Sequence, residues 1–343
     1  MKVALDISPI NSQHSPRGIG NYTKNLKDNL QRLNIEVIPI QNSKEEVHVD
    51  IYHFPYFDFF FRTLTPHKNA KNIVTIHDAI PLLFPKHFAR GIRGNINLFF
   101  QKKALTNIDA VICDSNTSKK DINKTLHIPD NKIFVVYLAA SGNFKQISNN
   151  KTLQITAKKY HLPEKFILYV GDVNWNKNVL PLLEAIKISN VNLVMVGKSL
   201  IDKSLPEVSE IENTIKKLNI GSKVTRLGFL TIEDLVHVYN LADLTIVPSL
   251  YEGFGLPVLE SMACGTPVVC SDNSSLSEIG KGAAIFCDSQ DPKDIAQKIK
   301  QVYSLTPKGK LALSTKLISH NSNYSWQKVA IETKLVYESA LNT

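Results

Sequence analysis

Cysteine is scarce in this sequence, and its spacing matches no common site. The chain has 343 residues, of which four are cysteines: Cys113, Cys264, Cys270 and Cys287. None belongs to a Cys-x-x-Cys pair or lies near a His-x-His pattern. We therefore expect reduced core thiols, and neither a disulfide framework nor a zinc site.

Long apolar runs are also missing. No apolar run approaches the ~18 residues that a membrane-spanning helix needs. The first residues, MKVALDISPI, show neither the apolar region nor the small-residue cleavage site of a signal peptide. Hydrophobic residues make up 43% and charged residues 21%, which is typical of a globular protein. These features predict a cytoplasmic protein.

Acidic residues are too few to balance the basic ones, mainly in the first part of the chain. Residues 1–150 carry 19 Lys and Arg against 12 Asp and Glu, a net charge of +7, whereas residues 151–343 carry 21 against 19, a net +2. This excess indicates an anionic partner such as a phosphate, an acidic lipid or a nucleic acid, or else a charge that serves solubility. The sequence contains no nucleic-acid recognition motif, so we expect no nucleic-acid partner.

Short β-branched segments alternate with longer helical patterns along the whole chain. They are KVALDIS, IEVIPI, DIYHF, NIVTIHD, DAVICDS and KIFVVY in the first half, and KFILYVG, VNLVMVG, KVTRLG, DLTIVPS, TPVVCSD and AAIFCD in the second. Continuous apolar strands are buried on both faces, so they predict parallel sheets covered by helices. The predicted fold class is α/β, with two doubly wound, Rossmann-like domains that face a cleft. We expect the first domain at residues 1–145, a linker near 141–151 and the second domain at 152–320.

Two glutamates flank a glycine-containing loop in the stretch YEGFGLPVLE. Glu252 follows a strand pattern, and Glu260 falls about one turn into a helix that is apolar on nearly all sides. An unpaired carboxylate is costly in such a helix, so a hydrogen-bonding ligand such as a ribose diol would stabilise it. The alternative is that Glu260 bonds a neighbouring backbone group or an arginine.

A second strand–loop–helix pattern, ILYVGDVNWNKNVLPLLEAI, places Lys177 just before a helix that begins near Asn178. A lysine at the positive end of a helix dipole is unfavourable unless an anion lies between them, and a diphosphate would serve. The alternative is a solvated lysine on a loop.

Two further candidates lie in the first half. Gly18 and Gly20 form part of a Gly-x-Gly-x-x-Gly pattern, but Thr23 occupies the third glycine position, so a nicotinamide site is weakly supported and a flexible loop facing a diphosphate fits better. His77 is expected at the carboxyl end of a strand. There it would bond a sugar hydroxyl, carry a proton or play a structural part.

The block YEGFGLPVLESMACGTPVVCSD resembles the glutamate–seven residues–glutamate motif of retaining glycosyltransferase family 4, the group 1 glycosyltransferases. RGIGNYTKNL, TIHDAIPLLFP, CDSNTSKKDI, YVGDVNWNKN and YSWQKVA extend the similarity over nearly the whole chain. The resemblance implies the GT-B fold and a retaining, metal-independent hexosyltransferase without a cofactor. Such an enzyme would move mannose, rhamnose, glucose or galactose from a GDP- or UDP-linked sugar to a saccharide acceptor. The acceptor would be lipid-linked, in bacterial cell-surface polysaccharide synthesis.

The resemblance also implies roles for individual residues. Glu252 and His77 would contact the transferring sugar and Lys177 the diphosphate. The remaining donor-binding residues would be Gly18, Gly20, Asn178, Gly253, Phe254, Gly255, Leu256 and Glu260, the last on the ribose. Many members carry an arginine soon after the glycine equivalent to Gly171, but here Asp172 stands there, so another basic side chain or Asn176 would have to share the charge.

The resemblance implies front-face attack, in which the leaving phosphate accepts the acceptor's proton. Covalent attack by Glu252 is the alternative. The resemblance further implies that residues 321–343 form a helix that packs on the first domain. Other interpretations are a nucleotide-sugar epimerase or a phosphorylase on the same fold, and a non-catalytic nucleotide-sugar-binding protein.

Aromatic and basic residues are mixed in two segments of the first domain, residues 52–62 and 90–103. Such segments would let the protein dock peripherally on an anionic membrane surface, at the inner face of the cell membrane. The alternative is that most of these phenylalanines belong to the core.

Overall fold

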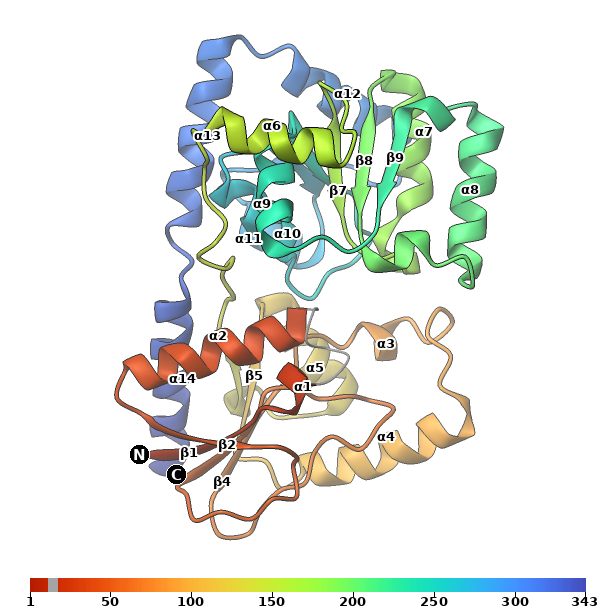
Figure 1. Ribbon diagram of the computed structural model, residues 1–343. Helices are drawn as coiled ribbons and strands as arrows, with labels where there is room; N and C mark the ends of the chain where they lie inside the picture. The colour runs from red at the N-terminus through yellow and green to blue at the C-terminus, as the bar shows by residue number, and fades with distance from the viewer. Residues whose placement is uncertain (12–17) are drawn as a thin grey trace. The chain divides into compact units, whose positions relative to one another are not determined.

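The chain divides into two units, each built on a six-stranded parallel sheet (Figure 1). The computed structural model describes residues 1–11 and 18–343. The first unit comprises residues 1–139 and 324–343, and the second comprises residues 140–323. Among the described residues, no helix combines the length and apolar character needed to cross a membrane.

The first sheet has the strand order β2-β1-β3-β4-β5-β6. Its strands are β1 (Lys2–Asp6), β2 (Glu36–Ile40), β3 (Ile51–Phe54), β4 (Lys71–Thr75), β5 (Ala110–Cys113) and β6 (Ile133–Val135). The interior strands β3 and β5 are buried at every residue, as their apolar sequences predict.

Helices that precede or follow these strands complete the first unit. They are α1 (Ser8–Asn11), α2 (Gly18–Arg32), α3 (Ile80–Leu83), α4 (Gly91–Leu105), α5 (Asn116–Leu126) and, from the end of the chain, α14 (Trp326–Leu341). Helix α14 packs against α2, and the Tyr337 hydroxyl lies 2.6 Å from Nδ1 of His53 on β3. The first unit is therefore discontinuous in sequence.

The second sheet has the order β12-β11-β10-β7-β8-β9, in which the direction of strand addition reverses between β7 and β10. Its strands are β7 (Ile167–Val170), β8 (Leu193–Val196), β9 (Val224–Leu227), β10 (Leu244–Val247), β11 (Val268–Ser271) and β12 (Ile285–Cys287). Its helices are α6 (Asn150–Lys159), α7 (Val179–Ser189), α8 (Pro206–Leu218), α9 (Ile232–Leu241), α10 (Leu256–Ala263), α11 (Ser274–Gly280), α12 (Pro292–Tyr303) and α13 (Pro307–Asn321). Short 3₁₀ turns occupy Asp130–Lys132 in the first unit, and Trp175–Lys177, Lys198–Ile201 and Gly221–Lys223 in the second.

Both units are doubly wound, Rossmann-like domains, which confirms the predicted α/β class. The boundary lies earlier than the linker predicted near residues 141–151. Phe144 is buried with its ring in a T-shaped contact with the Tyr239 ring, and the Ile147 N–H donates to Oδ1 of Asn240 at 2.8 Å. These contacts attach residues 140–147 to the second domain.

Candidate active site

The loops that follow β7 and β10 meet where the strand order of the second sheet reverses. These strands are parallel neighbours, so their carboxyl ends lie side by side. In open α/β sheets, ligands bind outside the carboxyl ends of the strands at such a point. The two loops are bonded to each other: the Leu250 N–H donates to the carbonyl of Asn176 at 2.8 Å, and Nδ2 of Asn176 donates to the carbonyl of Tyr251 at 2.9 Å.

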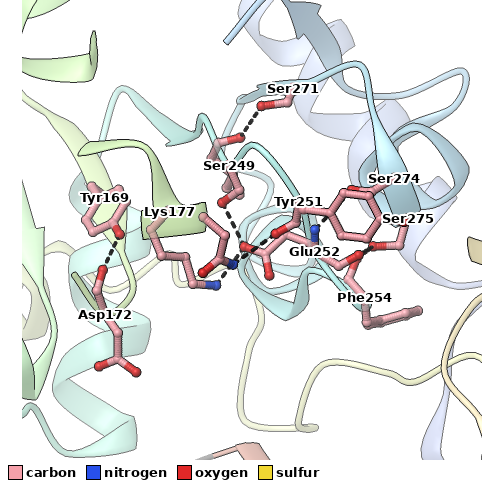
Figure 2. Close-up of polar contacts among 12 residues, drawn as sticks. Tyr169, Asp172, Lys177, Ser249, Tyr251, Glu252, Phe254, Ser271, Ser274 and Ser275 are labelled. Atoms are coloured by element: carbon pink, nitrogen blue, oxygen red, sulfur yellow. Dashed lines mark hydrogen bonds and ion pairs between the residues drawn. The ribbon is translucent and has the colours of Figure 1, made fainter. Parts of the chain in front are cut away.

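Lys177 and Glu252 form an ion pair across these loops (Figure 2). Nζ of Lys177 lies 2.6 Å from Oε1 of Glu252, and the Ser249 hydroxyl donates to the same oxygen at 2.7 Å. Both side chains are mostly buried. The position beside Lys177 where the sequence predicts an anion is thus held, in this structure, by a carboxylate of the protein itself.

Serine hydroxyls at the start of α11 hold the backbone around Glu252 (Figure 2). The Glu252 N–H donates to Oγ of Ser274 at 3.0 Å, and Oγ of Ser275 lies 2.9 Å from the carbonyl of Glu252 and 2.8 Å from that of Phe254. The sequence analysis missed both serines. Their signal is the run SDNSS directly after a strand, where small hydroxyl residues commonly bond nearby backbone.

Gly255 makes the turn into α10. Its φ is +106°, and a Cβ there would lie 2.5 Å from Cδ2 of the buried Leu276, so a side chain would be both strained and crowded. Helix α10 then begins at Leu256 with Pro257 in its first turn, which suits a residue without an N–H. This turn sets the course of the backbone between Gly253 and Leu256.

Asn178 holds neighbouring loops in place. It has a left-handed conformation with φ of 56°, directly before α7 begins at Val179. Its Nδ2 donates to the carbonyl of Pro248 at 3.0 Å and to that of Ser289 at 2.6 Å. The side-chain nitrogen of Asn178 thus bonds within the protein and positions the loop that carries Lys177.

Glu260 lies on α10 and bonds to a tyrosine of α9. The Tyr239 hydroxyl donates to Oε2 of Glu260 at 2.8 Å, so its partner is neither of the alternatives considered from the sequence, a backbone group or an arginine. Burial raises the pKa of Glu260 to about 7, although the bond from Tyr239 acts in the opposite direction. Near neutral pH this carboxyl is therefore only partly ionised.

Asp172 faces the loop after β8, where its Oδ1 accepts a hydrogen bond from the Ser199 hydroxyl at 2.8 Å. Its carbonyl accepts one from Tyr169 (Figure 2). The residue thus has a structural part in this domain. Lys177 is a cation at the loops after β7 and β10, where it pairs with Glu252.

In the first domain, His77 follows β4 and pairs with Asp114, which follows β5. Nδ1 of His77 lies 2.7 Å from Oδ2 of Asp114, and Nε2 lies 3.2 Å from the carbonyl of Pro55. Burial is the largest single effect and lowers the pKa of His77, but the Asp114 carboxylate, together with Asp78 and the Pro55 carbonyl, raises the net pKa. Because both neighbours are acceptors, the arrangement favours the doubly protonated ring. The sequence analysis missed Asp114, whose signal is its place at the end of the next buried strand.

Gly18 and Gly20 lie in the first turn of α2, and the prediction that they belong to a loop is wrong. The helix extends back to Gly18 because Tyr22, Leu26 and Leu30 repeat at helical spacing and are buried. The part of the expected loop at residues 12–17 lies outside the described residues.

Two Rossmann-like domains of this kind are the architecture of GT-B glycosyltransferases, and comparisons with known proteins agree. The family model described as "Glycosyl transferases group 1" matches residues 150–315, and the model described as "Glycosyltransferase Family 4" matches residues 40–140. The chain belongs to this family of glycosyltransferases, and it is therefore a transferase.

Similar proteins include two from Escherichia coli. O-antigen chain mannosyltransferase B is 26% identical over 293 residues, which cover 84% of this chain and 74% of that protein. Serotype-specific mannosyltransferase WbdA is 29% identical over 268 residues, which cover 76% of this chain but only 32% of that longer protein.

Two solved structures share the fold over almost their whole length. Sucrose-phosphate synthase from Thermosynechococcus elongatus superposes with a TM-score of 0.74 at 18% identity, covering 98% of each chain. HepE from Anabaena, solved in complex with UDP and glucose, also has a TM-score of 0.74, at 16% identity, covering 98% of this chain and 99% of that one.

Proposed function

We propose that this glycosyltransferase moves a hexose, with retention of anomeric configuration, from a GDP- or UDP-linked sugar to a saccharide acceptor. The observation that carries the proposal is the Lys177–Glu252 pair, 2.6 Å apart, on the loops where the second sheet reverses its strand order. The O-antigen mannosyltransferases among its relatives favour mannose as the sugar, and cell-surface polysaccharide synthesis as the process. A lipid-linked saccharide is then the acceptor.

The donor diphosphate binds against Lys177 and takes the place that Glu252 now holds. A phosphate oxygen there also meets the N–H groups at the start of α7, where the helix dipole favours negative charge. Glu252, released from Lys177, is then able to accept hydrogen bonds from the donor sugar. The backbone from Gly253 to Leu256 lines the sugar and phosphate, and ionised Glu260 binds the ribose diol.

Transfer breaks the bond between the anomeric carbon and the diphosphate and forms a bond to the acceptor oxygen on the same face of the sugar. The leaving phosphate accepts the acceptor's proton. Lys177 and the helix N–H groups stabilise the charge of the leaving group in place of a metal ion. Nε2 of His77 exchanges the carbonyl of Pro55 for a hydroxyl of the transferring sugar, while Nδ1 stays on Asp114. Gly18 and Gly20 also bind the donor.

The test is a panel of GDP- and UDP-linked sugars assayed with and without a saccharide acceptor in EDTA. Lys177→Ala and Glu252→Ala should each lower kcat/KM by about 10²–10³, the usual cost of removing one group that stabilises a transition state. Lys217→Ala, on the exposed side of α8, serves as the matched control and should leave it unchanged. Wild-type rates in Lys177→Ala or Glu252→Ala would overturn the assigned role. Conversion of the donor into an isomeric nucleotide-sugar without acceptor would indicate an epimerase.

A further inference from the structure

Helix α4 is apolar on two opposite sides, of which only one packs on the core of the first domain. Leu98 and Leu105 belong to the buried core. Ile92, Ile96 and Phe99 are 84%, 51% and 66% exposed. The spacing of these three residues, i, i+4 and i+7, places them in a single stripe along the helix. Figure 1 shows α4 as a long helix at the periphery of this domain.

The loop before β4 brings a cation to α4 and carries one more exposed aromatic residue. Phe61 is 64% exposed. The next residue, Arg62, places its guanidinium 4.0 Å from the centroid of the Phe100 ring on α4, and its Nε donates to Oδ1 of Asn97 at 3.3 Å. We call the surface formed by Phe61, Arg62, Ile92, Ile96, Phe99 and Phe100 the α4 surface.

Cations flank the α4 surface, and acidic residues are missing from its helix and both adjoining segments. Residues 79–108 contain Lys86, Arg90, Arg93, Lys102 and Lys103 but no Asp or Glu. Arg93 and Lys103 are exposed on α4 itself, and so is Lys102, whose Nζ donates to the carbonyl of Thr125 at 3.1 Å. Asp58, in the neighbouring loop, accepts hydrogen bonds from the backbone N–H groups of Phe60 and Phe61 at 2.6 and 3.0 Å. Its carboxylate is thus engaged within its own loop.

We propose that the α4 surface docks on the headgroup region of an anionic lipid bilayer. A helix parallel to a membrane inserts large apolar side chains to a shallow depth, while Lys and Arg beside them contact acidic headgroups. On α4 the apolar side chains that insert are Ile92, Ile96 and Phe99. The cations that contact headgroups are Arg93, Lys102 and Lys103. Nucleic acid would use the cations but leave the isoleucines in water. A second copy of the chain, docked symmetrically by this surface, would bring like charges together.

The test is flotation of the protein with vesicles of phosphatidylcholine, alone or with phosphatidylglycerol. The variant Phe99→Ser/Lys102→Gln/Lys103→Gln removes one exposed apolar residue and two cations from the α4 surface. The matched control, Ile155→Ser/Lys151→Gln/Lys158→Gln, makes the same kind of change on α6, where Ile155 is 68% exposed and both lysines are exposed.

Wild type and the control should bind the anionic vesicles at low salt and bind pure phosphatidylcholine at least about tenfold more weakly, since the headgroup attraction is missing. The α4 variant should lose at least about tenfold in partitioning to anionic vesicles while keeping its melting temperature. No binding of the wild type, or equal loss in both variants, would overturn the proposal. The proposal would also be overturned if sedimentation velocity showed that the wild type and the control are dimers and the α4 variant is a monomer. Vesicle binding needs no sugar transfer, and transfer to a soluble acceptor should survive the α4 changes, so the two proposals fail separately.

Discussion

Each charged candidate residue of either domain has a partner within that domain. Lys177 pairs with Glu252, Glu260 bonds Tyr239, and His77 pairs with Asp114. These partners orient each side chain before any ligand arrives. In the proposed function, the donor exchanges these hydrogen bonds for its own, so a substitution of a partner should change donor binding as much as a substitution of the candidate residue itself.

The pKa of Glu260, raised by burial to about 7, predicts that nucleotide binding depends on pH. A ribose diol donates hydrogen bonds, so it favours the ionised carboxyl, whose fraction falls from about nine-tenths at pH 8 to about one-tenth at pH 6. The affinity for GDP or UDP should therefore weaken about tenfold as the pH falls across this range. Calorimetry at both pH values measures it. Glu260→Gln should bind weakly at both, and a wild-type affinity that does not change with pH would contradict the ribose role.

Asp114 should control the protonation of His77. Asp114→Asn removes the carboxylate that raises the pKa of His77 and leaves the burial that lowers it, so this pKa should fall. NMR titration of the ring, assigned with a His77→Gln variant, measures the shift. Asp109→Asn is a suitable control because Asp109 pairs with Lys71 in the same domain and should not move the His77 titration. An unchanged pKa in Asp114→Asn would show that the pair does not set the charge.

At the scale of elements, the turn between β10 and α10 places Glu252 and starts the helix that carries Glu260. Glycine is needed at its end because Gly255 combines a positive φ with close packing against Leu276. The hydroxyls of Ser274 and Ser275 then bind the loop from α11. The loop is thus held from both sides, which keeps Glu252 near Lys177.

Gly255→Ala should destabilise the second domain more than Gly282→Ala. Both glycines have positive φ, +106° and +81°, but a Cβ at Gly282 would meet nothing within 4 Å. Backbone strain alone costs about 1–2 kcal/mol, and crowding against Leu276 should add about 1 kcal/mol at Gly255. Urea unfolding of the two variants gives the difference. Equal losses would mean that Leu276 moves aside without cost.

At the scale of the whole molecule, the chain leaves the first domain after residue 139 and returns to it at residue 324. The returning helix α14 buries Val336 and Tyr337 in the first domain, where His53 accepts or donates the bond to the tyrosine hydroxyl. Burial lowers the pKa of His53 to about 3, so this histidine stays neutral near physiological pH. The C-terminal helix α14 thus contributes to the stability of the first domain.

Tyr337→Phe should destabilise the first domain by about 1–3 kcal/mol, because it leaves a buried ring nitrogen of His53 without its partner. Tyr303→Phe is the matched control in the second domain, where the hydroxyl bonds Oδ2 of Asp243 at 3.1 Å from a less buried site. Calorimetry should show a loss for Tyr337→Phe that exceeds the loss for Tyr303→Phe. A smaller loss for Tyr337→Phe than for Tyr303→Phe would mean that the bond between Tyr337 and His53 does not hold α14 on the first domain.

The sequence by itself determined the class of fold and the loops that carry Lys177 and Glu252, because both depend on local patterns. Continuous apolar strands predict parallel sheets, and a strand followed by glycines and a helix predicts a loop at a carboxyl end. The start of α2 was misjudged because glycine is compatible with a loop and with a first helical turn alike. Its placement depended on which residues the core would bury.

Only the tertiary structure decided which side chains pair with one another. Lys177 and Glu252 lie 75 positions apart, on the loops after β7 and β10, and no periodicity within one segment relates them. The same holds for Glu260 with Tyr239 and His77 with Asp114, which meet because parallel strands and their helices bring distant segments together. The tertiary structure also decided that Phe57 and Phe59 belong to the core while Phe61 and Phe99 are exposed. Composition gives the number of phenylalanines, but only packing determines which of them remain in contact with solvent.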